Sequence, residues 1–150
     1  MEHFDSQMAA RVWQRVQNIS TPEEPTADIL LLLQEELTEL HRYNQLSGAL
    51  DSTAKPLLQQ LIKLTQQSAA VLRGIYFLLT DTSAQSQPYP LPKELPVSAL
   101  RRSYGTTLSR ISRYGHWSTH PEYGPGFLQL TNLSRQRCQL LLQLLGSMRL

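Results

Sequence analysis

Hydrophobic residues recur every three or four positions through most of this chain, which is the spacing that gathers them on one side of an α-helix. The pattern predicts four long helices, over residues 26–47, 57–80, 98–118 and 125–145, and a shorter one over residues 5–18. No stretch shows the strict alternation of a half-buried strand. The sequence therefore predicts an all-α fold.

The segment from Asp81 to Ser98 cannot continue the helix before it, because prolines stand at positions 88, 90, 92 and 96. A connection of this length can carry the chain from one end of a helical bundle to the other, so that the second and third long helices need not be antiparallel neighbours. We expect a single domain, with an N-terminal helix and linker at residues 1–25 and the bundle at residues 26–150.

Polar residues interrupt the apolar stripes of the long helices. Glu36 lies on the same stripe as Ile29, Leu33, Leu40 and Tyr43, where a solvated glutamate would not normally be found. The stripe of the third long helix is expected to be Leu100, Tyr104, Thr107, Ile111 and Tyr114. The remaining polar positions on the second and fourth stripes are Thr65, Ser68, Ser134 and Arg137.

The two halves of the chain show a weak internal repeat. Residues 35–47 align with residues 106–118, which pairs the Arg42-Tyr43 dipeptide with Arg113-Tyr114. The second long helix aligns with the fourth, pairing leucines 61, 64 and 72 with leucines 130, 133 and 141. The repeat predicts two related helical hairpins joined by the proline-rich segment.

Two phrases, LRGIYFLLT at residues 72–80 and HPEYGPGF at residues 120–127, together with the paired Arg-Tyr dipeptides, resemble the ferritin-like superfamily, and most closely its rubrerythrin-type domains. The resemblance spans about residues 29–146. It implies a ferritin-like four-helix bundle with a long crossover between the second and third long helices. In that family the first and third helices each supply an inward glutamate, and the second and fourth each supply Glu-x-x-His, to hold two irons.

The ligand pattern that the resemblance implies is largely absent from this chain. Glu36 keeps the carboxylate of the first helix, but Thr107 stands at the position of the third, and Ser134 with Arg137 at those of the fourth. The second helix offers Thr65 and Ser68, or Gln67 and Ala70 in a register shifted by two residues. One carboxylate cannot hold two metals, and a guanidinium repels cations. We therefore expect no metal, no other cofactor and no catalytic residues of a di-iron enzyme.

Arg137 suggests what has replaced the metals. If the four helices converge as they do in the family, Glu36 and Arg137 face each other across the core and form a charge-assisted pair. The remaining polar groups are expected to be satisfied by one or more of Thr65, Ser68, Thr107, Ser134, Tyr43 or Tyr114. The alternative is that Arg137 extends along its helix to solvent.

Two further sets of residues are candidates for reactive sites. His116 and His120 are one helical turn apart and, with Glu122, are candidates for a metal site; the alternative is a surface pair at a helix terminus. Cys138 follows Arg137, which can lower a thiol pKa and create a nucleophile. We favour a buried structural thiol.

The charge of the chain is unevenly distributed. Residues 1–97 carry 7 Lys and Arg against 11 Asp and Glu, whereas residues 98–150 carry 7 Arg against one Glu. A basic half can mark a nucleic-acid-binding face. We favour instead the packing of an acidic helix pair against a basic one. The longest apolar run, residues 29–33, is too short to span a membrane, and a single cysteine fits a reducing compartment, so we expect a cytoplasmic protein.

These features favour a structural or interaction protein rather than an enzyme, and we expect a homodimer. Trp13, Trp117 and Tyr123 lie near predicted helix ends, where a second copy could bury them. The alternative is a rubrerythrin-related redox or metal-binding protein with an atypical site. Its candidate residues are Glu36, His41, His116 and His120.

Overall fold

Residues 24–148 are described by a computed structural model, in which four helices account for the regular structure. They are α2 (Thr26–Leu46), α3 (Lys55–Thr80), α4 (Pro96–Trp117) and α5 (Gly124–Ser147). This part of the chain contains no strand, so the all-α prediction is confirmed. The helix predicted over residues 5–18, with Trp13, lies outside the described residues.

The ends of the helices follow local chemistry. Pro56, Pro96 and Pro125 each occupy the first turn of a helix, where an amide hydrogen would have no partner. The Asp51 carboxylate accepts hydrogen bonds from two backbone amides just before α3. Helix α3 ends at Thr80, and the next residue, Asp81, caps it in a left-handed conformation with φ of 58°.

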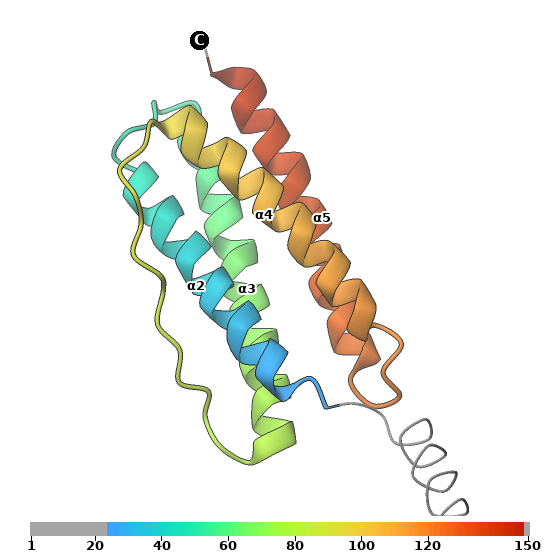
Figure 1. The fold of residues 1–150 in the computed structure, drawn as a ribbon. Coiled ribbons are helices and arrows are strands. Elements are labelled where there is room, and N and C mark those ends of the chain that lie inside the picture. Colours follow the sequence, from blue (N-terminus) through green and yellow to red (C-terminus); the bar gives the residue numbers. More distant parts are fainter. Residues whose placement is uncertain (1–23, 149–150) are drawn as a thin grey trace, which may run out of the picture.

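The helices form two antiparallel pairs, α2 with α3 and α4 with α5 (Figure 1). Helix α3 also packs along α5, whereas α2 and α4 approach each other less closely. Residues 81–95 contain no helix and run beside α2 from the end of α3 to the start of α4 (Figure 1). The backbone amide of Tyr89 donates to Oγ1 of Thr38 at 2.9 Å, which fastens this segment to α2. None of the helices in residues 24–148 is long and apolar enough to cross a bilayer.

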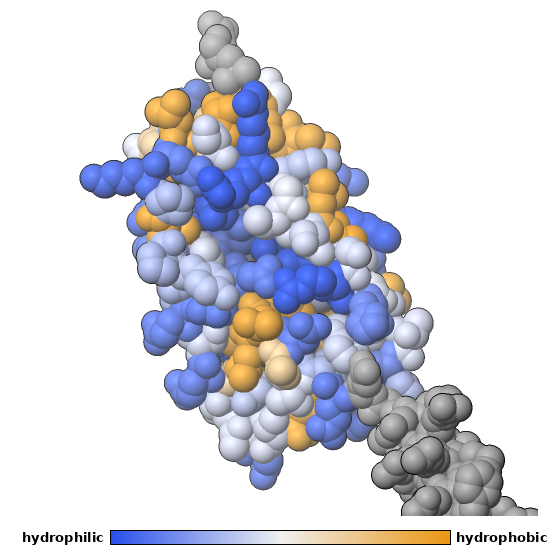
Figure 2. Space-filling model, in the orientation of Figure 1, coloured by the Kyte–Doolittle hydropathy of each residue, from blue (hydrophilic) through white to orange (hydrophobic). Residues whose placement is uncertain are grey.

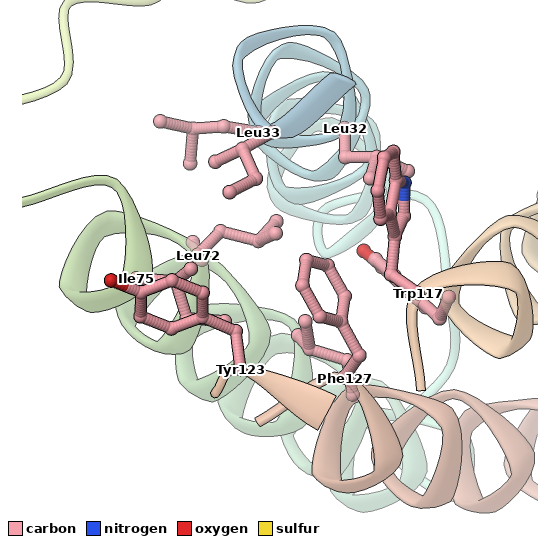
Figure 3. Close-up of a cluster of buried hydrophobic side chains, with 11 residues drawn as sticks. Leu32, Leu33, Leu72, Ile75, Trp117, Tyr123 and Phe127 are labelled. Carbon is pink, nitrogen blue, oxygen red and sulfur yellow. The ribbon is translucent and has the colours of Figure 1, made fainter. Parts of the chain in front are cut away.

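The hydrophobic core has two parts. One, drawn in Figure 3, surrounds Leu72 and Phe127 near the α4–α5 turn, and side chains from all four helices point into it. The other lies near the opposite end of the bundle, around Leu58, Leu100 and Leu141. In each helix, the stretch between the residues of one core part and those of the other carries buried polar side chains. A polar layer therefore divides the apolar core.

Two aromatic residues expected to be exposed are core residues. Trp117 and Tyr123 are each only 9% exposed and belong to the cluster in Figure 3. The indole nitrogen of Trp117 donates to Asp28 at 2.9 Å, and its ring packs against Phe127. The prediction that Trp117 and Tyr123 await burial by a second copy was wrong, because the α4–α5 turn folds them back into their own bundle.

Candidate functional site

Glu36 and Arg137 are in direct contact at the centre of the polar layer. Nη1 of Arg137 donates to Oε2 of Glu36 at 2.5 Å, and both side chains are completely buried. The predicted pair is therefore confirmed, and the alternative in which Arg137 reaches solvent is wrong. Burial opposes the charge of Arg137, but the Glu36 carboxylate, assisted by Glu39, raises its pKa, so the arginine stays charged.

A second arginine, Arg110, also contacts Glu36. Its Nε lies 2.6 Å from Oε1 of the carboxylate, at an angle outside the hydrogen-bonding range, and its Nη2 donates to Thr107 at 3.2 Å. Burial opposes the charge of Arg110, but Glu36, assisted by Glu39, raises the arginine pKa. The glutamate is therefore held between one guanidinium from α4 and one from α5.

Arg110 was missed because the apolar stripe of α4 was assigned to the wrong residues. Tyr104 and Ile111 are only half-buried, while Ser103 and Arg110 are buried, so the inward positions are 100, 103, 107, 110, 114 and 117. Apolar character favoured Tyr104 and Ile111 in the sequence. Arg110 follows Thr107 by three residues, and residues three apart lie on the same face of a helix. This spacing was the available indication that Arg110 faces inward.

Glu39, one turn beyond Glu36 on α2, anchors a second polar cluster. Its carboxylate contacts Arg42 at 2.5 Å and accepts hydrogen bonds from Ser103 at 2.6 Å and Thr106 at 2.8 Å. Burial tends to raise the pKa of Glu39, but Arg110 and Arg42, with the Ser103 hydroxyl, lower it from 4.5 to about 2. Glu39 is therefore ionised at neutral pH. Sequence reasoning overlooked it because it lies at the edge of the apolar stripe.

Several hydroxyl groups do not serve the pair as expected. Thr65, Ser68 and Ser134 are buried in the layer, but each hydroxyl donates to the backbone carbonyl four residues earlier in its own helix. These three hydroxyls are therefore not the ones that satisfy the pair. Thr107 does bond to an arginine of the layer, but to Arg110 rather than Arg137.

The two predicted tyrosines are fully buried, and their surroundings differ. The phenol of Tyr43 hydrogen-bonds to the Ser103 hydroxyl, which links it to Glu39. The phenol of Tyr114 has no hydrogen-bond partner among the described residues. Burial raises the pKa of both phenols, so both remain protonated at neutral pH.

The buried layer carries more positive than negative charge. Three guanidinium groups, those of Arg42, Arg110 and Arg137, face the carboxylates of Glu36 and Glu39. A cation placed among them would meet a net positive field. At the edge of the layer Glu35 pairs with Arg113 of α4, and a pocket of about 270 Å³ opens there between α2, α4 and residues 89–92. Figure 2 shows hydrophilic side chains across the middle of this face.

The ion pairs also explain the uneven charge of the sequence. Acidic side chains of α2 are neutralised by arginines of α4 and α5, namely Arg110, Arg113 and Arg137. The interpretation that an acidic helix pair packs against a basic one is confirmed for α2 but wrong for α3, which carries Lys55, Lys63 and Arg73 and no acidic residue. Two of the arginines that made the second half look basic, Arg110 and Arg137, are unavailable to an external partner because they are buried.

The other candidate residues, His116, His120 and Cys138, make contacts that belong to the turn or to the packed interior. Nδ1 of His120 accepts hydrogen bonds from the backbone amides of Glu122 and Tyr123, so this histidine shapes the α4–α5 turn, and His116 stacks edge-on against Trp117. Within residues 24–148 no three or more His, Cys, Asp or Glu side chains are grouped so that they could hold a metal ion. Cys138 is a buried free thiol whose pKa is raised by burial, although Arg137 and Arg110 oppose the shift.

Comparisons with protein-family models, with curated proteins and with solved structures find no match for this chain.

Proposed function

We propose that this chain is a metal-free ferritin-like bundle of the rubrerythrin type, in which a buried ion-pair layer occupies the place of a di-iron site. It acts as a structural or interaction protein of the cytoplasm rather than as a redox enzyme. The observation that carries the proposal is the contact of Arg110 and Arg137 with the Glu36 carboxylate. Arg137 stands at a position where the family resemblance implies a metal ligand, and Arg110 lies three residues after another such position, Thr107.

The arrangement of the helices supports the proposal. Two antiparallel pairs are joined by a long non-helical segment that runs the length of the bundle, as a ferritin-like crossover does (Figure 1). The polar layer lies midway along the helices and contains the positions where the resemblance implies ligands. Thr65, Ser68 and Ser134 turn their hydroxyls to their own backbones, which leaves the arginines to satisfy Glu36.

The charge of the layer supports a structural role. Iron and manganese need several carboxylate or imidazole ligands, whereas within residues 24–148 Glu36 and Glu39 are the only buried ones, and arginines engage both. A fully buried pair of this kind constrains which helix faces meet, because any shift in register strands a charge in the core. We therefore propose that the role of the layer is to fix which helix faces meet in the bundle.

Metal analysis of the purified protein tests the proposal. Cells are grown with added iron and manganese, and the metal content per chain is measured by mass spectrometry. We expect well below one metal per chain. About two metals per chain would refute the metal-free assignment and favour the atypical redox protein instead.

A matched variant, R110Q/S134E/R137H, removes both guanidiniums and restores one Glu-x-x-His pair beside Glu36. If the arginines exclude metal, this variant should take up more iron or manganese than the natural chain at the same helical content by circular dichroism. Equal metal content in two folded proteins would contradict the exclusion by charge.

A further inference from the structure

A groove of about 470 Å³ lies between α3 and α5 and is lined by five glutamines, two leucines and one lysine. On α3 its residues include Gln60, Leu64 and Gln67. On α5 they include Gln136, Leu140 and Gln143. The glutamines and the lysine are exposed, and Leu64 and Leu140 are half-buried between them. None of these side chains belongs to the polar layer, so the groove is a separate surface.

The two sides of the groove repeat the same spacing. Each helix presents a glutamine, a leucine four residues later and a second glutamine three residues after that. Because α3 and α5 are antiparallel (Figure 1), a local two-fold axis perpendicular to the groove relates one set to the other. This axis exchanges Gln60 with Gln136, and Gln67 with Gln143.

We propose that this groove is the interface through which two copies of the chain form a homodimer. A primary amide both donates and accepts hydrogen bonds, so a row of glutamines is complementary to a second copy of itself. The local two-fold axis strengthens the argument, because glutamine then faces glutamine when two copies meet face to face. A closed two-fold dimer requires a self-complementary patch of this kind.

The size of the surface is sufficient. Helix α5 has 24 residues, which corresponds to a length of roughly 36 Å, and two adjacent helices are roughly 20 Å wide. The groove itself covers only about two turns of each helix, so the interface also has to include the exposed residues that flank it. The whole face of the two helices offers roughly 700 Å² per copy, near the area that each partner contributes to a stable protein interface.

Lys63 determines how the two copies are oriented. Of the eight residues that line the groove it alone is charged, and the local axis relates it to Gln139. If the dimer axis runs along the helices, α3 lies over the partner's α5 and Lys63 faces the partner's Gln139. If the dimer axis is instead perpendicular to the helices, α3 lies over the partner's α3 and the two copies of Lys63 repel each other. The dimer therefore pairs α3 with the partner's α5.

The oligomeric state of glutamate variants tests the interface. Variant Q60E/Q67E/Q136E/Q143E places four carboxylates in the groove with little change in side-chain shape. Control N44D/Q45E/Q85E/Q87E makes the same four amide-to-carboxylate changes at exposed positions outside it. Sedimentation velocity should give twice the 17.1 kDa chain mass for the natural protein and the control. The groove variant should be monomeric, with dimer affinity reduced by roughly 100-fold.

A lysine series completes the test. Variant Q60K/Q67K/Q136K/Q143K should also be monomeric alone, and mixing it with the glutamate variant should restore a dimer that native mass spectrometry identifies as mixed. Gln139→Lys should weaken the natural dimer, because it places a second cation opposite Lys63. A monomeric natural protein at about 100 µM, a groove variant that stays dimeric, or a control that dissociates would each overturn the proposal.

Discussion

Replacement of Glu36 by glutamine is the sharpest probe of the polar layer. The change keeps the size of the side chain and removes its charge, so that two fully buried guanidiniums at 2.5 and 2.6 Å lose their shared counter-ion. Exposed ion pairs contribute about 0–1 kcal/mol. Removing one partner of a buried pair costs about 3–5 kcal/mol, because the other charge is left uncompensated in the core.

The expected loss of 3–5 kcal/mol is a large part of the total stability of a domain, which is about 5–15 kcal/mol. For a chain of this size it corresponds to a fall in melting temperature of about 6–20 °C. Urea unfolding followed by circular dichroism measures the free energy of unfolding directly. Glu122→Gln is the matched control, because Glu122 is exposed and its replacement should change stability by less than about 0.5 kcal/mol.

A triple variant separates the cost of a stranded charge from the value of the pair. In E36L/R110M/R137M all three charged groups are replaced by apolar side chains, and no guanidinium is left facing a missing carboxylate. We expect it to be more stable than Glu36→Gln and within a few kcal/mol of the natural protein. A Glu36→Gln variant that loses less than about 1 kcal/mol would refute the reasoning, since the pair would then behave as a solvated one.

Two further predictions concern Glu39 and the α4–α5 turn. Because the pKa of Glu39 is lowered from 4.5 to about 2 in the folded state, its stabilisation is complete above pH 4.5 and is lost as the pH falls towards 2, by about 3 kcal/mol. The free energy of unfolding of Glu39→Gln should therefore fall less over this range than that of the natural protein, and equal falls would contradict the assignment. Gly124→Ala should cost about 1–3 kcal/mol, because its Cβ would lie 2.4 Å from the backbone oxygen of Ser118. Gly105→Ala, whose Cβ would meet nothing within 4 Å, should instead stabilise α4 by about 0.5–1 kcal/mol, and equal effects of the two alanines on thermal unfolding would count against the predicted clash.

Much of the fold followed from local periodicity. The four long helices begin and end within a few residues of the positions that capping residues and prolines suggested, although α5 continues through Gly146 to Ser147. The anomaly at Glu36 and its partner Arg137 were also recognisable from the sequence. Each stands on an otherwise apolar stripe, and a buried charge needs an opposite charge nearby.

The inward face of α4 could not be assigned from its apolar residues. Ser103 and Arg110 are more polar than Tyr104 and Ile111, yet they are the ones that face the core. The reason lies in the separation of α2 and α4, which is wide enough for arginine and glutamate side chains to fill the space between them. The spacing between helices depends on how the two helix pairs pack against each other, and no local sequence pattern predicts that spacing.

By itself the sequence determined that the chain is helical and where the helices lie, because these properties depend on periodicity, and it named Glu36 and Arg137 as a possible core pair without deciding that they meet. Only the tertiary structure decided that Glu36 is shared by two arginines, that Glu39 has its own cluster and that the aromatic residues of the turn are buried. It also placed glutamines of α3 and α5 along one groove. Those features depend on which helix faces meet and at what distance, and packing alone sets both.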